Sequence, residues 1–459
     1  MRLPAACLLL LGLFACTAAN TNAPADEAHA GTPLPFIEDD YGRALAEAKA
    51  KGVPLFVDVW APWCHTCRSM KAYVLSDKAL ARHAGRFVWL EVNTDLTSNA
   101  AFQEKYPVEF WPTLYVIDPR QEKALLRFAG SATVAQLEKL FEDGERAYKG
   151  GVTGAEALLA RGDALYGEGR SAEAAETLAE ALAEAPADWS RRGRAVESLL
   201  TAMYGAKQYE PCARKALEEL PRTPRSLSWA NGALVGLSCA LALPADHAAS
   251  QSLRGATEAK VAEALAPPVI DMAADDRSGL YEVRVEAREA EKDEAGVKAL
   301  SEEWLKYLEA EAAKAPNPDA RSVFDSHRMV AAMKLGTPAR VIPAIEQSEK
   351  DLPQDYNPPA RLATLYRLQG RLDDALAASD RALARVQGSR RLTVLSGRAD
   401  LHLARKDSAA AVKTLEEALT FAKTLPASQV SPRVVSGLEK KLAGLQQPSA
   451  QPQSQAAPK

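Results

Sequence analysis

Two cysteines, Cys64 and Cys67, are separated by two residues and directly follow a strand-like apolar run, Pro54 to Trp60. Three-residue spacing on a first helical turn brings two sulfurs within bonding distance, so the pattern predicts a redox-active dithiol. Cys64 would cap the helix, where the dipole and the free N–H groups favour a thiolate. Cys67 would lie one turn further in and be more shielded, which suits a resolving thiol. The apolar run contains one acid, Asp58.

A zinc half-site is the alternative interpretation of a C-x-x-C pair. Zinc needs two further ligands at similar spacing. The sequence has no second C-x-x-C pair and no H-x₃₋₅-H pair, and Cys212 and Cys239 stand alone. We therefore expect neither a metal nor a cofactor at the dithiol.

The elements that position the dithiol are those of an α/β domain. Apolar, β-branched and aromatic residues form the run that precedes the cysteines and recur at Phe87 to Val92 and from Thr113 to Ile117. Such runs are typical of buried strands. A turn after the first of them opens the helix that carries the cysteines.

These segments together resemble thioredoxin-fold proteins over about Phe36 to Lys149. The resemblance rests on Val57-Asp58-Val59-Trp60-Ala61-Pro62-Trp63-Cys64-His65-Thr66-Cys67-Arg68, on the strand at 87–92 and on Trp111-Pro112-Thr113-Leu114-Tyr115-Val116-Ile117. The continuation Val74-Leu75-Ser76-Asp77 is most similar to the C-terminal domain of DsbD-type periplasmic thiol:disulfide interchange reductases.

The resemblance implies a role for each matching residue. Cys64 is the nucleophile and Cys67 the resolving cysteine, and the two form the redox-active disulfide. Asp58 matches a buried acid that exchanges a proton with Cys67; the alternative is an Asp that only hydrogen-bonds the backbone. Pro112 matches a cis-proline beside which a substrate strand pairs; the alternative is a trans-proline that starts a strand. The substrate-binding residues are then Trp63, Trp111 and Pro112.

Three positions depart from the family pattern or leave a choice open. Thr66 stands where thioredoxin itself has a proline, and Glu91 occupies the position of a family lysine near the buried acid. Both changes should alter the redox potential. His65 either stabilises the neighbouring thiolate when protonated or is a solvent-facing spacer.

From about Gly154 onward, Ala/Leu/Glu/Arg helices with short breaks replace the strands. Residues at all seven spacings of the tetratricopeptide pattern are Gly162, Leu165, Gly169, Ala174, Leu178, Ala181 and Pro186. A second copy keeps Ala363, Tyr366, Gly370, Ala375 and Ala382, and a third keeps Ala399, Ala411, Leu415 and Ala418. Residues 150–445 thus resemble a degenerate tetratricopeptide solenoid of about six helical hairpins. The fold class is multidomain: an α/β thioredoxin-like domain (36–149) followed by an all-α solenoid.

The repeats contain no catalytic motif. Stacked helical hairpins form a concave surface for peptides or proteins, so recruitment is the functional interpretation, and a rigid spacer or dimerisation element is the alternative. Cys212 and Cys239 lie on adjacent predicted helices; two buried free thiols are favoured over a disulfide. His83, His247, His327 and His402 are isolated and are interpreted as packing or surface residues.

The N-terminus is typical of an exported protein. Residues 1–15 combine Arg2 with an apolar run too short to span a bilayer, as in a signal peptide. Leu13-Phe14-Ala15-Cys16 resembles the lipobox of bacterial lipoproteins, which implies acylation of Cys16; an ordinary secretory signal is the alternative. Thr17 favours the outer membrane over the inner one by the same resemblance.

Composition indicates a chain that is mostly folded and has linker-like segments at both ends. Residues 16–35 are expected to be a flexible tether and residues 446–459, rich in Pro, Gln and Ser, a disordered tail. The 459 residues include 56 Lys+Arg and 60 Asp+Glu, which argues against a nucleic-acid partner.

The leading hypothesis is a periplasmic, lipid-anchored thiol:disulfide oxidoreductase that reduces protein disulfides. Its expected partners are disulfide-bearing protein substrates, which the repeats recruit, an upstream thiol electron donor and the membrane. The alternative is a protein-binding scaffold whose thioredoxin module is redox-sensing or vestigial.

Overall fold

A mixed five-stranded sheet begins the part of the chain that the computed structural model describes, residues 33–446. The strand order is β1-β3-β2-β4-β5, in which β1, β3 and β2 are parallel and β4 and β5 join antiparallel. The strands are β1 (Phe36–Glu38), β2 (Leu55–Trp60), β3 (Val88–Asn93), β4 (Thr113–Asp118) and β5 (Lys123–Ala129). Because β2 is the central strand, the loop at its C-terminal end is supported from both sides.

Helices cover both faces of the sheet. They are α1 (Tyr41–Lys51), α2 (His65–Ser69), which continues as a π-helical turn (Met70–Val74), α3 (Ala100–Lys105) and α4 (Val134–Tyr148). On one face Phe56 and Trp89 pack against Phe141 of α4, and on the other Val57 and Leu90 pack in a cluster with the alanines of α1. Burial on both sides explains why the β2 run is apolar except at Asp58. We call the elements from β1 to α4 the sheet domain.

The rest of the described chain is helical, and we call it the repeat region. Its helices are α5 (Gly154–Gly167), α6 (Ser171–Glu184), α7 (Arg192–Gly205), α8 (Tyr209–Glu219), α9 (Leu227–Leu241), α10 (Ser250–Leu265), α11 (Ala274–Ala290), α12 (Glu294–Lys314), α13 (Pro318–Ser322), α14 (Asp325–Lys334), α15 (Ile342–Asp351), α16 (Asn357–Leu368), α17 (Leu372–Leu383), α18 (Arg390–Ala404), α19 (Ser408–Ala422) and α20 (Pro432–Gln446). Within residues 33–446 they form seven successive pairs, with the short α13 inserted before α14 and α20 closing the end. The expectation of six hairpins was therefore wrong by one, because the pairs between α7 and α15 keep little of the repeat pattern.

Small residues allow the paired helices to approach closely. A Cβ added to Gly162 of α5 would lie 2.5 Å from Cγ of Leu178 on α6. One added to Gly236 of α9 would lie 2.6 Å from Cβ of Ala216 on α8. Gly162, a position of the first repeat copy, therefore lies where two helices cross in close contact.

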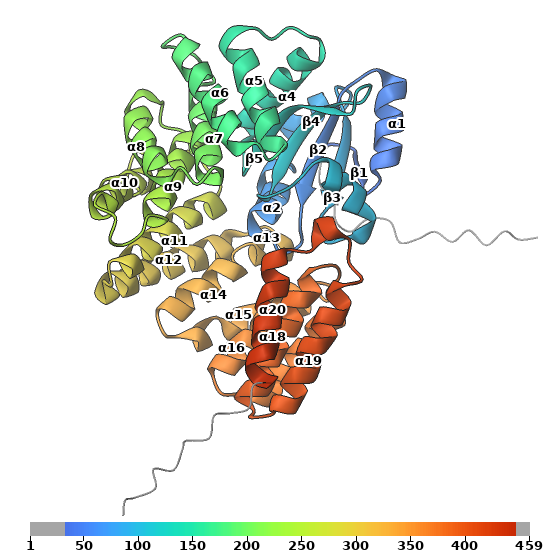
Figure 1. Cartoon of the computed structure of the whole chain (residues 1–459), viewed down its shortest axis with the longest axis vertical. Helices are drawn as coiled ribbons and strands as arrows, with labels where there is room; N and C mark the ends of the chain where they lie inside the picture. Colours follow the sequence, from blue (N-terminus) through green and yellow to red (C-terminus); the bar gives the residue numbers. More distant parts are fainter. Residues whose placement is uncertain (1–32, 447–459) are drawn as a thin grey trace, which may run out of the picture.

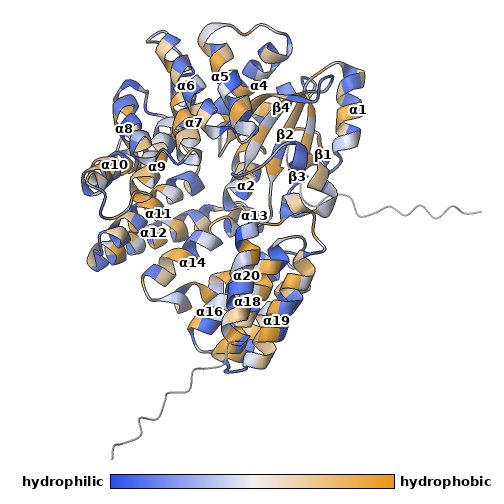
Figure 2. Ribbon diagram, viewed as in Figure 1, coloured by the Kyte–Doolittle hydropathy of each residue, from blue (hydrophilic) through white to orange (hydrophobic). Residues whose placement is uncertain are grey.

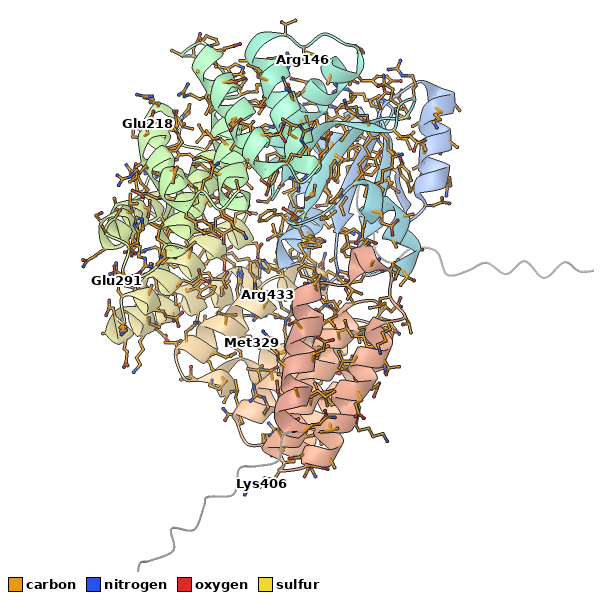
Figure 3. The ribbon with its side chains drawn as sticks, viewed as in Figure 1. Arg146, Glu218, Glu291, Met329, Lys406 and Arg433 are labelled. Atoms are coloured by element: carbon orange, nitrogen blue, oxygen red, sulfur yellow. A yellow bond between two sulfur atoms is a disulfide. The ribbon has the colours of Figure 1, made fainter. Side chains whose placement is uncertain are left out.

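The repeat region curves around the sheet domain (Figure 1). It starts with α5 against β5, and the segment before α20 returns to α3 on the far side of the same domain. Exposed charged residues such as Glu218, Glu291 and Lys406 lie along the outer edge of this arc, whereas the half-buried Met329 lies on its inner side (Figure 3). Hydrophobic residues are concentrated in the strands and between packed helices (Figure 2). The inner side of the arc therefore faces α2, which carries the cysteines.

Candidate functional site

Cys64 and Cys67 are joined by a disulfide at the start of α2. The sulfurs are 2.05 Å apart and the Cα atoms 5.3 Å apart. Cys64 is the N-cap residue, and the backbone N–H of Cys67 donates to its sulfur at 3.0 Å. Cys64 is 5% exposed and Cys67 is fully buried. The sulfur of Cys64 is therefore the one that lies nearer to solvent and next to a hydrogen-bond donor.

Tryptophans surround the disulfide. Trp60, Trp63 and Trp111 pack against the two cysteines and Ala61. The rings of Trp63 and Trp111 are 5.1 Å apart. The Trp111–Pro112 peptide bond is cis. The structure thus brings the sequence-predicted Trp63 and Trp111 to the dithiol, with Pro112 adjoining Trp111.

Hydrogen bonds from the indole groups fix two of these rings. Trp63 Nε1 donates to Asp95 at 3.2 Å, and Trp111 Nε1 donates to Thr94 Oγ1 at 2.9 Å. Burial raises the pKa of Asp95 to about 6, against the opposing effects of the Trp63 hydrogen bond and the charge of Arg390. Thr94 and Asp95 were not predictable from the sequence, because no local pattern links a loop after a strand to Trp111, 17 residues from Thr94, or to Trp63, 32 residues from Asp95.

Asp58 lies in the middle of β2 and is 1% exposed. Its register partner in the parallel neighbour β3 is Glu91, which is 2% exposed, so both side chains point to the same face of the sheet. Lys71 Nζ lies 3.0 Å from Glu91 and 3.1 Å from the centre of the Trp60 ring. Lys71, in the π-helical turn that follows α2, therefore places a positive charge beside Glu91 and Trp60.

The repeat region closes over the first turn of α2. His65 Nδ1 lies 2.9 Å from both carboxylate oxygens of Asp275, at the start of α11, and Thr66 Oγ1 donates to the same carboxylate at 2.9 Å. Arg68 pairs with Asp355 at 2.6 Å. The interpretation of His65 as a solvent-facing spacer was wrong, because its side chain is 32% exposed and is held by a helix of the repeat region.

Two further contacts complete this cover. Asn357 Nδ2, at the start of α16, donates to the carbonyl of Pro62 at 3.1 Å. The guanidinium of Arg390, at the start of α18, lies 3.6 Å from the centre of the Trp63 ring. Residues from Pro62 to Arg68 are thus contacted from three separate helix pairs.

The charge state of the His65–Asp275 pair follows from its surroundings. Burial opposes the charge on His65, but the Asp275 carboxylate raises its pKa above the usual value. Burial likewise opposes the charge on Asp275, and His65 lowers its pKa below the usual value. Both shifts favour an imidazolium–carboxylate pair between the sheet domain and the repeat region.

His65, Asp275 and His327 form the group whose atoms could hold a metal ion in the described part of the chain, with their ligand atoms within 4.8 Å of one another. The rings of His65 and His327 are 4.1 Å apart. His327 Nδ1 is also 2.6 Å from Ser278 Oγ, which accepts from Trp304 Nε1. In this structure the donor atoms serve a hydrogen-bonded network, and His327, interpreted as isolated, is buried within it.

A second disulfide joins Cys212 of α8 to Cys239 of α9, with Cα atoms 6.1 Å apart. Both residues are fully buried. The preference for two free thiols was wrong, because the close crossing of α8 and α9 brings the two Cβ atoms within disulfide range.

The predicted signal peptide, the predicted acylation at Cys16, most of the predicted tether and nearly all of the predicted tail lie outside the described residues. Among the helices of residues 33–446, none has the length and hydrophobicity needed to cross a bilayer.

Comparison with known proteins places both parts in context. Residues 41–145 match the family model of a thioredoxin-like domain, and residues 356–424 match that of a tetratricopeptide repeat. The thiol:disulfide interchange protein DsbD of Pseudoalteromonas atlantica is 34% identical over 82 residues, which cover 17% of this chain and 14% of that protein. Chloroplastic thioredoxin M4 of Arabidopsis thaliana is 30% identical over 131 residues, covering 28% of this chain and 61% of that one.

Among solved structures, a tetratricopeptide repeat protein from Parabacteroides merdae aligns with 63% of this chain and 98% of its own, at 12% identity and a TM-score of 0.41. The chain matches only part of the length of the two curated relatives named above, 14% of one and 61% of the other.

Proposed function

From a thioredoxin-like domain joined to a tetratricopeptide-repeat region, we propose that this protein is a thiol:disulfide oxidoreductase that reduces disulfides of other proteins. The observation that carries the proposal is the Cys64–Cys67 disulfide at the N-terminal end of α2, with Cys64 the more exposed sulfur. The similarity to a thiol:disulfide interchange protein supports the same chemistry.

The reaction proceeds by two exchanges in the reduced protein. The Cys64 thiolate, stabilised by the N–H of Cys67, attacks a substrate disulfide, and one substrate sulfur leaves as a thiolate. Cys67 then attacks the Cys64 sulfur of the mixed disulfide and releases the second substrate thiolate. The dithiol loses two electrons and closes to the disulfide present in this structure. Asp58 is proposed to accept the proton of Cys67.

A thiol electron donor has to restore the dithiol after each turnover. We propose that this donor and the substrates are proteins, and that the repeat region recruits them. Support comes from the position of the repeats, which contact Pro62, His65, Thr66 and Arg68 around the sulfurs. A substrate protein whose disulfide reaches Cys64 must therefore contact the repeat region or displace it.

The proposed location is the periplasm, with Cys16 acylated and the protein held to the outer membrane. This proposal rests on the sequence of residues 1–17. Replacing Cys16 with Ala should move the protein from the membrane fraction to the soluble periplasmic fraction; unchanged membrane association would contradict lipid anchoring.

One assay tests the oxidoreductase proposal. The full chain, supplied with dithiothreitol, should accelerate the reduction of insulin disulfides, and Cys64→Ser should abolish this acceleration. Equal rates with the two proteins would overturn the proposal. A matched Cys67→Ser variant should accumulate mixed disulfides, because the resolving thiol is missing, and mass spectrometry of those adducts would identify the substrates.

The enclosure of the dithiol favours a second candidate, a redox-sensing scaffold. The two cysteines are at most 5% exposed, and helices of the repeat region contact the turn that carries them. A sensor would change conformation on reduction without catalysing turnover. Hydrogen exchange of α11 and α16 that changes on reduction, together with no insulin reduction, would favour this candidate.

A further inference from the structure

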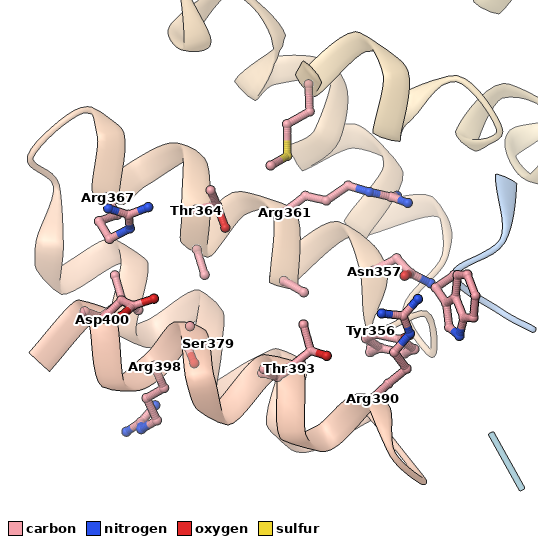
Figure 4. A pocket seen from close by; sticks show the side chains of 17 residues that line it. Tyr356, Asn357, Arg361, Thr364, Arg367, Ser379, Arg390, Thr393, Arg398 and Asp400 are labelled. Carbon is pink, nitrogen blue, oxygen red and sulfur yellow. The ribbon is translucent and has the colours of Figure 1, made fainter. Parts of the chain in front are cut away.

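A cavity of about 310 Å³ lies between α16 and α18, at the edge of the sheet domain (Figure 4). Its wall contains apolar residues such as Met329, Val394 and Leu401, and one residue of the sheet domain, Trp63. This volume is at the lower end of the range for small-ligand sites, so it admits a short segment of chain and not a folded domain.

Three arginines in the wall have no ion-pair partner. No salt bridge or side-chain hydrogen bond joins Arg361, Arg367 or Arg390 to another residue of the described chain, and Nη1 of Arg361 is buried without a hydrogen-bond partner. By contrast, Arg398 pairs with Asp380, and Asp400, the acid in the wall, pairs with Lys441. Asp325 and Asp355 act on the charge of Arg361, and Asp95 acts on that of Arg390, but without a direct ion pair, so the wall holds arginine N–H donors that have no direct acceptor.

Two hydroxyl groups in the wall also lack partners. Tyr356 is 9% exposed and Ser379 is 2% exposed, and neither hydroxyl oxygen makes a hydrogen bond. A buried polar group without a partner is costly. Burial also lowers the pKa of Arg361 and of Arg390, which shows that desolvation opposes their charges. A carboxylate in the cavity would supply acceptors to both kinds of donor.

The arginines are spread along the groove. Arg361 and Arg367 are six residues apart on α16, which corresponds to about 9 Å along the helix axis. An extended peptide rises about 3.3 Å per residue, so about three residues of it span this separation.

The cavity adjoins the residue that precedes the dithiol in the chain. Trp63, which lines the cavity, is followed directly by Cys64, and Arg390 stacks on its ring at 3.6 Å. We propose that the cavity binds an acidic peptide segment of the substrate and thereby presents a disulfide on the same segment to Cys64. This inference rests on the proposed function and adds a substrate class to it.

Turnover of such a substrate follows the exchange described above. An S–S bond forms between Cys64 and one substrate sulfur as the substrate disulfide breaks, and Cys67 then releases that sulfur. The dithiol supplies both electrons, and dithiothreitol restores it in the assay.

The test compares two synthetic peptide disulfides that differ only in charge, one with Glu and one with Gln throughout the six residues that precede the cysteine. For the full chain, Arg367→Ala should lower kcat/KM for the Glu peptide relative to the Gln peptide by at least about tenfold, because a charge-assisted hydrogen bond is lost. Arg405→Ala is the matched control, since Arg405 is the C-cap residue of α18, is exposed and pairs with Asp373 outside the cavity. It should leave the ratio unchanged. An equal ratio in the wild type and Arg367→Ala would overturn the inference.

Two further measurements keep the outcomes distinct. Glutathione disulfide serves as a third substrate. If Arg367→Ala lowers kcat/KM for glutathione disulfide alone, the cavity recognises the carboxylates of a small disulfide, which would overturn the peptide assignment. If the wild type reduces no disulfide, the proposed function fails. Calorimetric binding of the Glu peptide to the wild type and to Arg367→Ala then tests separately whether the cavity binds an acidic peptide. Binding that is equally weak for the Glu and Gln peptides would overturn it.

Discussion

The Nδ1 atom of His65 lies 2.9 Å from both carboxylate oxygens of Asp275, although 210 residues separate them in the chain. His65 is the neighbour of Cys64, and Asp275 begins α11 of the repeat region. Thr66, the other residue between the two cysteines, donates to the same carboxylate, so the His65–Asp275 ion pair and this hydrogen bond together hold the repeat region over the dithiol.

Replacing Asp275 with Asn should make the dithiol more accessible. Breaking one partner of a buried pair costs about 3–5 kcal/mol, so the closed arrangement should lose population. We expect the Cys64–Cys67 disulfide to be reduced by a phosphine at least about tenfold faster than in the wild type. The control is Asp373→Asn, which removes an exposed pair with Arg405 and should not change the rate. Equal rates for Asp275→Asn and the wild type would mean that the pair does not hold the cover.

The stabilisation by His65 should depend on pH. The groups that face it are Asp275, Glu282, His327 and Arg361. Because the folded pKa of His65 lies above its usual 6.5, its contribution is complete below that value and is lost as pH rises through the folded pKa. Asp275 contributes above its usual 3.8, and its contribution is lost as pH falls through its lowered folded pKa.

The pair therefore stabilises the protein most between these two limits. The difference in melting temperature between the wild type and His65→Gln should be largest near pH 5–6 and should shrink as the pH rises above His65's folded pKa. His402→Gln, on α18, is the control, because burial lowers the pKa of His402 and no carboxylate pairs with it in the described chain. A difference for His65→Gln that stays constant from pH 5 to 9 would contradict the assignment of an imidazolium.

The Cys212–Cys239 disulfide should stabilise the repeat region. The two residues are 27 positions apart, and closing a loop of that length in the unfolded chain corresponds to about 3–4 kcal/mol. The free energy of unfolding of the double variant Cys212→Ala, Cys239→Ala should therefore be lower by that amount, and its denaturation midpoint should lie at a lower denaturant concentration. A midpoint equal to that of the wild type would show that these cysteines are not bonded in solution.

Two glycine-to-alanine substitutions should act in opposite directions. Gly162→Ala places a Cβ 2.5 Å from Leu178, and such overpacking should destabilise the protein by about 1–3 kcal/mol. Gly255→Ala, on the exposed side of α10, meets nothing within 4 Å and should stabilise it by about 0.5–1 kcal/mol. Chemical denaturation measures both, and a stabilising Gly162→Ala would contradict the close crossing of α5 and α6.

Local patterns were enough to predict the two kinds of architecture. The continuous run of apolar, β-branched and aromatic residues around Asp58 predicts a buried strand, and the spacing of Cys64 and Cys67 predicts a dithiol at a helix start, because both depend on neighbours within a few residues. The seven repeat positions from Gly162 to Pro186 predict a helical hairpin for the same reason. The count of hairpins was wrong where those positions are occupied by other residues.

Contacts between distant segments were not predictable. The Cys212–Cys239 bond depends on the crossing of α8 and α9, and the Lys71–Glu91 pair depends on how α2 lies over the sheet. Each of these contacts is decided by packing geometry and not by a sequence period.

The sequence by itself determined that the chain has a dithiol on an α/β domain and a helical array behind it. Only the tertiary structure decided that the array returns to cover the dithiol, with Asp275, Asp355 and Arg390 reaching residues 63–68. The physical reason is that the curvature of a solenoid is the sum of small rotations between successive helix pairs. The sequence of one repeat does not determine that sum, but the position of every side chain on the inner side of the arc depends on it.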